Sequence, residues 1–245
     1  MLMPLKPLFA CAILALAFSA TESAAQAFVR KPFLQLGSPV SASVCWRLDK
    51  SSKVDMKYGM TAGALDLTAS QAAAGTDGCV AATGLTPSTK YFYELSVGGV
   101  KNAGQGDQYF ITHPPVGAAG KYSFWILGDA GDGGDGQAAV RDAYLKVNGG
   151  THSDAFILLG DNAYEDGLDK ELTDKHFQIY PTVNANTFSW ATIGNHEQQS
   201  KGVGHLAAFY LPTEGQSGGV ASKSELFYSF DYGNIHWICL DSEQS

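Results

Sequence analysis

An apolar run that ends in glycine and is followed at once by a short polar residue occurs three times in the second half of the chain. The three turns are Gly128-Asp129, Gly160-Asp161 and Gly194-Asn195. Runs that are apolar almost throughout are typical of strands buried on both faces in parallel sheets. In such a sheet the carboxyl ends of neighbouring strands meet at one edge, where ligand sites form. The sequence therefore predicts an α/β layered domain with three polar turns along one edge.

The segments around these turns alternate between strand-like and helix-like patterns. We expect strands over Tyr122–Leu127, Ala155–Leu159, Leu226–Phe230 and Ile235–Leu240, and a helix over about Gln137–Asn148. A glycine-rich turn from Gly128 to Gly136 separates the first strand from that helix. Strands alternating with a helix favour an α/β domain over an all-β or all-helical one.

The first half of the chain has a different pattern, with short β-rich runs separated by turn residues and no helical period. We expect strands over Pro32–Leu36, Ser41–Arg47, Lys53–Tyr58, Cys79–Thr83, Tyr91–Val97 and Gln108–Thr112. Spacing of this kind predicts an antiparallel all-β sandwich. Val44 and Trp46 alternate on one strand, and Tyr91, Tyr93 and Leu95 on another, so we expect all five in its core.

The N-terminus has the features of an export signal. Lys6 precedes the apolar stretch Leu8–Phe18, and Ala25-Gln26-Ala27 has the small-x-small pattern of a cleavage site. The stretch is shorter than the roughly 20 residues that a spanning helix needs, so we expect no stable membrane anchor. The expected divisions are a signal peptide over 1–27, a sandwich over 28–112, a Pro-rich linker over 113–120 and the α/β domain over 121–245. We therefore predict a secreted or periplasmic protein, cleaved after Ala27.

Cysteine content and charge limit the function further. Removal of the leader leaves Cys45, Cys79 and Cys239, and the simplest expectation is one disulfide and one buried thiol. Cys45 and Cys79 lie in predicted strands of the same domain, so they form either a bridge or two buried thiols. The net charge of -8 supplies no basic surface for nucleic acid. Any phosphate chemistry would need local positive charge, for which a bound metal is the obvious source.

The residue types at the three turns suit such a metal. Carboxylate and amide oxygens bind hard or borderline cations, and one aspartate can bridge two of them. Two cations about 3.5–4 Å apart can activate water and hold both the attacking and the leaving oxygen of a phosphoryl displacement. The predicted partner is a small phosphate ester.

The order of these blocks resembles a known family. Gly128-Asp129-Ala130-Gly131, then Gly160-Asp161 with Tyr164, then Gly194-Asn195-His196-Glu197 resemble the first three of five blocks of the calcineurin-like metallophosphoesterases. Tyr164 narrows the resemblance to the purple acid phosphatases. Lys31–Gly37 and Gly84–Tyr93 resemble the fibronectin type III-like domain that precedes the catalytic domain in that family.

The resemblance implies a role for each matching residue. Asp129 and Tyr164 would bind the first metal, Asp161 would bridge both metals, Asn195 would bind the second, His196 would contact phosphate or protonate the leaving group, and Glu197 would support these residues. In the family the first metal is Fe(III), and the second is divalent Fe, Zn or Mn. The implied activity is that of an acid phosphatase, which cleaves phosphate monoesters by attack of a metal-activated hydroxide.

The chain also departs from the family pattern. The later blocks Val-x-x-His and Gly-His-x-His, with three histidine ligands, are absent. We therefore expect an incomplete metallophosphoesterase domain that is inactive as it stands. Two alternatives remain open: a metallophosphodiesterase or nucleotidase of the same superfamily, and a non-enzymatic fragment with a binding sandwich domain.

None of the histidines outside these blocks is expected to replace a missing ligand. His205 lies in a Gly-rich segment read as a loop, and His236 lies in an apolar run that predicts a buried strand position. His113, His152 and His176 are expected next to a linker, in a turn and on a helix surface, with no special role.

Overall fold

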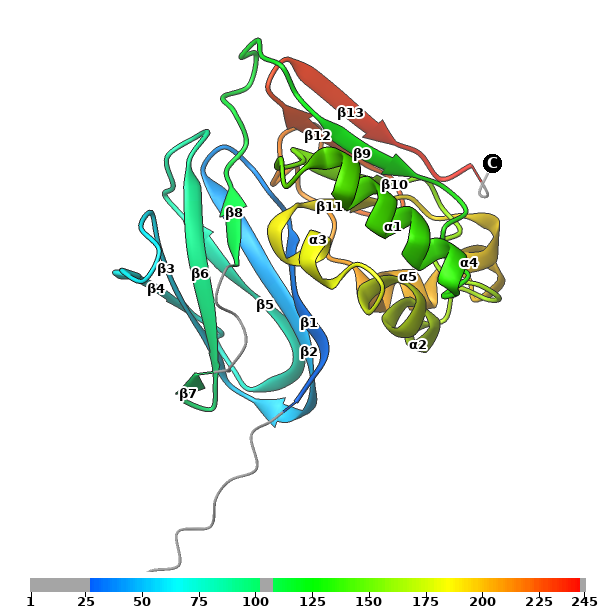
Figure 1. The fold of residues 1–245 in the computed structure, drawn as a ribbon, viewed down its shortest axis with the longest axis horizontal. Coiled ribbons are helices and arrows are strands. Elements are labelled where there is room, and N and C mark those ends of the chain that lie inside the picture. The colour runs from blue at the N-terminus through cyan, green and yellow to red at the C-terminus, as the bar shows by residue number, and fades with distance from the viewer. Residues whose placement is uncertain (1–26, 102–107, 243–245) are drawn as a thin grey trace, which may run out of the picture.

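The computed structural model of the protein describes residues 27–101 and 108–242. The signal-peptide prediction concerns residues that lie, apart from Ala27, outside the described part of the chain. The chain begins with two antiparallel sheets, which occupy the left half of Figure 1. One sheet has the order β1 (Phe28–Gln35), β2 (Ser41–Ser52), β5 (Gly75–Thr83). The other has the order β4 (Leu67–Ser70), β3 (Val54–Gly59), β6 (Lys90–Val97), β7 (Val100–Lys101), with β8 (Tyr109–Ile111) also paired to β6.

Side-chain alternation explains how these sheets pack. Along β6 the residues Tyr91, Tyr93 and Leu95 are buried, whereas the residues between them are half-buried. Val44 and Trp46 on β2 are likewise buried, so the predicted core positions are confirmed. The short strands β4 and β7 were not predicted, because their exposed residues carry no apolar alternation.

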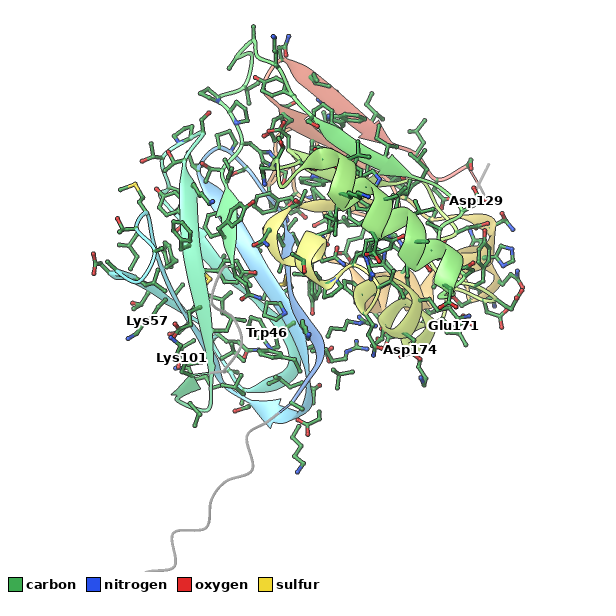
Figure 2. All side chains as sticks on the ribbon, in the orientation of Figure 1. Trp46, Lys57, Lys101, Asp129, Glu171 and Asp174 are labelled. Atoms are coloured by element: carbon green, nitrogen blue, oxygen red, sulfur yellow. A yellow bond between two sulfur atoms is a disulfide. The ribbon has the colours of Figure 1, made fainter. Side chains whose placement is uncertain are left out.

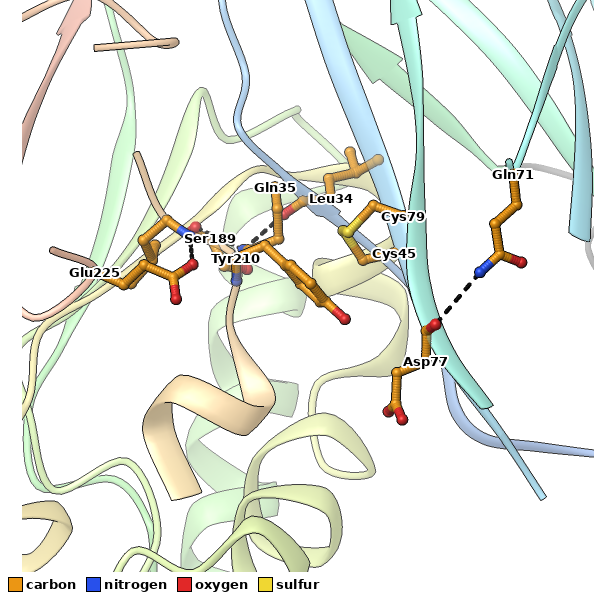
Figure 3. Close-up of a disulfide and its surroundings, with 10 residues drawn as sticks. Leu34, Gln35, Cys45, Gln71, Asp77, Cys79, Ser189, Tyr210 and Glu225 are labelled. Atoms are coloured by element: carbon orange, nitrogen blue, oxygen red, sulfur yellow. Dashed lines mark hydrogen bonds between the residues drawn. A yellow bond between two sulfur atoms is a disulfide. The ribbon is translucent and has the colours of Figure 1, made fainter. Parts of the chain in front are cut away.

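A disulfide joins the two longest strands of the first sheet. Cys45 on β2 and Cys79 on β5 face each other in register and are bonded, at a sequence separation of 34 residues. Of the two alternatives for these cysteines, the structure has the bridge (Figure 3). Cys239 is free and half-buried. One pair and one thiol is therefore the arrangement found, although the thiol is less buried than expected.

The second half of the described chain has a parallel sheet at its centre. Its strands are β9 (Phe124–Leu127), β10 (Ala155–Leu158) and β11 (Ser189–Ala191), in the order β11-β10-β9. The helix α1 (Asp135–Asn148) joins β9 to β10 and crosses in front of the sheet in Figure 1. Trp125 of β9 stacks on Tyr144 of α1 with ring centroids 3.7 Å apart. The predicted parallel arrangement is present, and β10 lies in the middle of it.

A β-hairpin covers the face of this sheet that is opposite α1. It consists of β12 (Tyr228–Tyr232) and β13 (Ile235–Cys239). The ring centroid of Phe124 on β9 lies 5.1 Å from that of Trp237 on β13. The ring of Trp190 on β11 stacks on that of Phe230 on β12, with a centroid distance of 3.7 Å. Since Phe124 precedes Trp125, whose ring packs on α1, neighbouring side chains of β9 point to opposite faces. The sheet is thus enclosed between α1 and the hairpin.

Short helical segments connect β10 to the later strands. They are α2 (Asp169–Leu172), a π-helical turn (Thr173–Phe177), α3 (Pro181–Asn186), α4 (Asn195–Gln199) and α5 (Val203–Ala208). None of the helices in the described part of the chain has the length and apolar character needed to cross a membrane.

Buried polar contacts join the β-rich half to the α/β half. Gln35 of β1 is fully buried, donates from Nε2 to the carbonyl of Ser189 at 2.9 Å, and accepts from the backbone N–H of Tyr210 at 3.0 Å (Figure 3). Arg30 of β1 and Arg47 of β2 both bind the carboxylate of Asp169, the first residue of α2. The first sheet therefore fixes the position of α2.

Three histidine predictions are wrong. His205 lies in α5 and is fully buried, because Val203–Ala208 forms a helical turn where a loop was expected. His236 lies on β13 as predicted, but its side chain is exposed, because it points to the outer face of the hairpin and pairs with Asp231. His176, expected on a helix surface, is buried beside Phe156 and Tyr180.

Candidate metal centre

The turns that follow β9, β10 and β11 lie against one another at one edge of the sheet. The backbone N–H of Asp129 donates to the carbonyl of Gly160 at 3.2 Å, which joins the first turn to the second. The backbone N–H of His196 donates to Oδ1 of Asp161 at 3.1 Å, which joins the third turn to the second. Because β10 is the central strand, Asp161 lies in the one turn that touches both others.

Glycine is required where these turns approach most closely. A methyl group at Gly194 would lie 2.3 Å from both the backbone nitrogen and Oδ1 of Asp161. A methyl group at Gly131 would lie 2.3 Å from the backbone nitrogen of Ala163. Any residue with a side chain at either position would push the turns apart. The close contact between the turns therefore requires glycine at both positions.

The two aspartates themselves adopt an uncommon backbone conformation. The φ angle is +55° at Asp129 and +51° at Asp161, in the left-handed region that residues other than glycine seldom adopt. The sharp turn was expected at the preceding glycine, but φ is not positive at Gly128, and Asp129 itself turns the chain there. Asparagine and aspartate tolerate this region best, and such strain is common at functional sites.

Four of the five predicted site residues lie close together. The Tyr164 hydroxyl lies 3.4 Å from Oδ1 of Asp129, and the Tyr164 ring packs edge-on to the His196 ring at a centroid distance of 4.5 Å. His196 Nε2 lies 4.0 Å from Oδ2 of Asp161. Asn195, the fifth, is exposed at the start of α4, between Gly194 and His196.

The charges of this cluster are strongly negative. Burial, and then the nearby carboxylates of Asp161 and Asp129, raise the pKa of Tyr164 to about 12. No lysine or arginine of residues 27–101 or 108–242 forms an ion pair with either carboxylate. A cation placed between these oxygens would remove the repulsion and would favour the phenolate form of Tyr164.

His196 favours its protonated, positively charged form. Its Nδ1–H donates to the carbonyl of Glu165, and this hydrogen bond is the main cause that raises the pKa of His196. The carboxylate of Asp161 acts in the same direction. Because Nδ1 is occupied, Nε2 is the ring nitrogen left to face Asp161 and any bound anion.

Glu197 supports the second and third turns from within the protein. It is fully buried, and its Oε1 accepts backbone N–H groups of Asn162 and Ala163 at 2.7 and 3.1 Å. Its Oε2 accepts those of Asp161 and Gly194 at 3.0 and 2.8 Å. Burial raises the pKa of Glu197, and the bonds from Gly194, Ala163 and Asn162 oppose that rise. Glu197 was expected to support the site residues, and no feature of the sequence indicates that it accepts four backbone N–H groups.

The donor set fits one cation better than two. The Tyr164 hydroxyl lies near the carboxylates of both Asp129 and Asp161. Three oxygens of these kinds would suit a hard trivalent or divalent ion. A second position would have Asp161 and the exposed Asn195. Among the described residues, no group of three or more His, Cys, Asp or Glu side chains is placed to hold a metal ion. The assignment of these residues as metal ligands therefore stays a prediction.

A small cavity adjoins the centre. It has a volume of about 230 Å³ and is lined in part by Gly128, Asp129 and Tyr180. A larger hollow of about 590 Å³ lies on the β-rich half beside Lys57 and Lys101, far from Asp129 (Figure 2). Of the predicted site residues, Asp129 alone is among those that line the smaller cavity.

Comparison with known proteins agrees with this fold. No family model matches the chain. Purple acid phosphatase 21 of Arabidopsis thaliana is 30% identical over 165 residues, which are 64% of this chain and 33% of that protein. The chain therefore spans about a third of the length of this relative.

Solved structures show the same relationship at the level of the fold. Purple acid phosphatase PPD1 from yellow lupin (Lupinus luteus) seeds superposes with a TM-score of 0.67 at 17% identity, covering 84% of this chain and 43% of that one. PhoD superposes with a TM-score of 0.61 at 15% identity, covering 94% and 54%. The chain is thus related in sequence to the purple acid phosphatases and has the fold of a purple acid phosphatase-like metallophosphoesterase.

Proposed function

We propose that the protein is an exported metal-dependent acid phosphatase that hydrolyses phosphate monoesters with a binuclear centre of Fe(III) and a divalent Fe, Zn or Mn ion. The observation that carries the proposal is the meeting of three strand-end turns around Asp161. The similarity to purple acid phosphatase 21 supports it. The leader sequence supports export, and the net charge of -8 disfavours nucleic acid as a partner.

Each residue has a role in this proposal. Asp129, Asp161 and Tyr164 hold the first metal, and Asp161 with Asn195 holds the second. When bound, the two ions supply an activated water and positive charge for the phosphate oxygens. The Nδ1 hydrogen bond of His196 fixes its ring, and its raised pKa keeps it protonated in weakly acidic solution. His196 Nε2 then binds a phosphate oxygen or protonates the departing alkoxide.

The same proposal covers the domains and the level of activity. Residues 28–112 form a fibronectin type III-like domain, 113–120 the linker, and 121–245 the N-terminal part of a metallophosphoesterase domain. Since the three turns supply a fuller set of ligands for one cation than for two, we expect the chain alone to bind the second metal weakly. Turnover by the chain alone should therefore be slow or absent.

The variant Asp161→Ala tests the proposal. Measurements are metal content after reconstitution with iron and zinc, and hydrolysis of p-nitrophenyl phosphate at acid pH by a version of the protein extended with the two histidine blocks. We expect metal content to fall and kcat/KM to drop by more than about 100-fold, because a ligand should matter more than its supporting residues. Asp135→Ala, on the exposed start of α1, is the matched control and should retain both properties.

The outcomes separate the proposal from its alternatives. Unchanged hydrolysis in Asp161→Ala would refute the proposed site. Faster cleavage of bis(p-nitrophenyl) phosphate than of the monoester would assign a phosphodiesterase instead. Failure of the extended protein to bind any transition metal would refute the metal-dependent function altogether.

A further inference from the structure

The segment that carries Tyr164 is held by a carboxylate from outside the three turns. This loop, residues 164–168, leads from the second turn to α2. Oε1 of Glu171 accepts the backbone N–H of Glu165 at 2.6 Å, and Oε2 accepts those of Asp166 and Leu168 at 3.1 and 3.0 Å. One side chain therefore satisfies three of the loop's backbone donors.

Lys175, one helical turn after Glu171, also holds the loop. Nζ of Lys175 lies 3.4 Å from Oε1 of Glu171 and donates to the carbonyl of Tyr164. The side chains of Glu171 and Lys175 are 21% and 28% exposed, so both are half-buried. Hydrogen bonds to charged groups are about twice as strong as those between neutral groups. The pair thus binds both the beginning and the end of the loop.

The loop determines the direction of two site residues. It carries Tyr164, whose ring packs against His196, and the Glu165 carbonyl, which accepts the Nδ1–H of His196. If the loop shifts, the phenol moves away from Asp129 and the imidazole loses its fixed orientation. Geometry at both residues therefore depends on groups that lie outside the cluster.

Helix capping alone does not account for these contacts. Glu171 is the third residue of α2, and a bond from that position to the N–H of Leu168 is half of a capping box. The N–H groups of Glu165 and Asp166 precede the helix, and the contact of Lys175 with Tyr164 has no role in capping. Three of the four bonds to the loop thus serve the loop itself.

We propose that Glu171, together with Lys175, is a positioning residue that fixes the loop 164–168 and through it the directions of the Tyr164 phenol and the His196 imidazole. The consequence for catalysis rests on the proposed function, but the fixing of the loop does not. Glu171 and Lys175 contact the loop and neither reacting side chain, so their loss would change the orientation of the Tyr164 and His196 side chains.

The test compares Glu171→Ala with Asp174→Ala in the full chain. Asp174 forms an exposed ion pair with Lys170 beside the same helix, and Figure 2 labels it near Glu171, so it controls for loss of an acidic group there. Hydrogen exchange should quicken by at least about tenfold at the amides of residues 165–168 in Glu171→Ala, which corresponds to loss of one hydrogen bond to a charged group. Exchange in α1 and β10 should be unchanged.

Contact between the two rings is the second readout. Cross-relaxation between the Tyr164 and His196 ring protons should be present in the wild type and in Asp174→Ala, and should be lost in Glu171→Ala. Glu171→Gln keeps one acceptor oxygen and should restore part of the protection and of the ring contact. Unchanged exchange, or unchanged ring contact despite faster exchange, would overturn the proposal.

Kinetics separate this proposal from the proposed function. In the extended phosphatase, Glu171→Ala should lower kcat by about 10- to 100-fold, as for groups that orient ligands, with a smaller change in KM. Absence of phosphatase activity in every form would refute the proposed function, and exchange and ring contact would still decide whether Glu171 positions the loop.

Discussion

Glu197 gives the most direct test of how the turns are held together. Its two carboxylate oxygens accept four backbone N–H groups in a site with no exposure to water. Four donors facing two oxygens favour the ionised carboxylate. In Glu197→Gln one oxygen is replaced by an NH₂ group, which cannot accept a hydrogen bond. Two donors then lose their acceptor and face another donor.

The expected loss of stability follows from these contacts. A hydrogen bond to a charged group contributes about 1.5–3 kcal/mol, so losing two costs about 3–6 kcal/mol. Relief of burying a charge offsets part of this loss, and we expect the free energy of unfolding to fall by about 3 kcal/mol. The site residues should loosen together, because the four donors belong to both the second and the third turn.

Urea unfolding at pH 7, followed by tryptophan fluorescence and far-UV circular dichroism, measures the change. Glu214→Gln is the matched control, since Glu214 forms an exposed ion pair with Lys223. It should lower stability by no more than about 1 kcal/mol. If Glu197→Gln lies within about 0.5 kcal/mol of the control, below the net value of one typical hydrogen bond, the four contacts do not hold the turns and the reasoning is refuted.

Two further predictions concern stability. Burial lowers the pKa of His113 to about 4. Between about pH 6.5 and 4 only the unfolded chain takes up the proton, so the contribution of His113 to the free energy of unfolding is full above about pH 6.5 and falls as the pH drops toward 4. The loss from this residue is about 2 kcal/mol at pH 5. His113→Gln should flatten this part of the pH profile in urea unfolding, and a profile identical to the wild type would contradict the assignment. Replacing Cys45 and Cys79 by Ala should cost about 4 kcal/mol from the 34-residue separation, measured against Cys239→Ala, which should cost much less. Equal melting curves for the two cysteine variants would show that the bridge adds nothing.

Much of the fold could be predicted because it follows from local patterns. Alternation along β6 and the uniformly apolar β10 determine which faces are buried, and parallel pairing then brings the three turns to one edge. The closeness of the three turns, and so of Asp129, Asp161 and His196, follows from that edge, whereas the directions of the Tyr164 and His196 side chains also depend on the loop 164–168. The assignment of Asp129, Asp161, Tyr164 and Asn195 as metal ligands stays a prediction.

Other features depend on contacts that no local pattern encodes. The role of Glu197 depends on which backbone N–H groups lack partners after the turns have met, and that of Glu171 on where the loop passes. The burial of His205 and the exposure of His236 were missed because neither segment's pattern says which neighbours cover it: α5, which carries His205, packs against α2, and His236 points away from the hairpin face that covers the sheet. Sequence periodicity says nothing about those neighbours.

The ion pairs of Arg30 and Arg47 with Asp169 have a consequence for protein engineering. Arg30 is 2% exposed and also donates to the Thr173 hydroxyl at 2.9 Å. Removal of the β-rich half would leave Asp169 without its two cationic partners and would expose the surface around Thr173. Asp169 would then lose both of the ion pairs that fix the first residue of α2. A transplant of the α/β half into another scaffold would therefore have to carry both arginines with it.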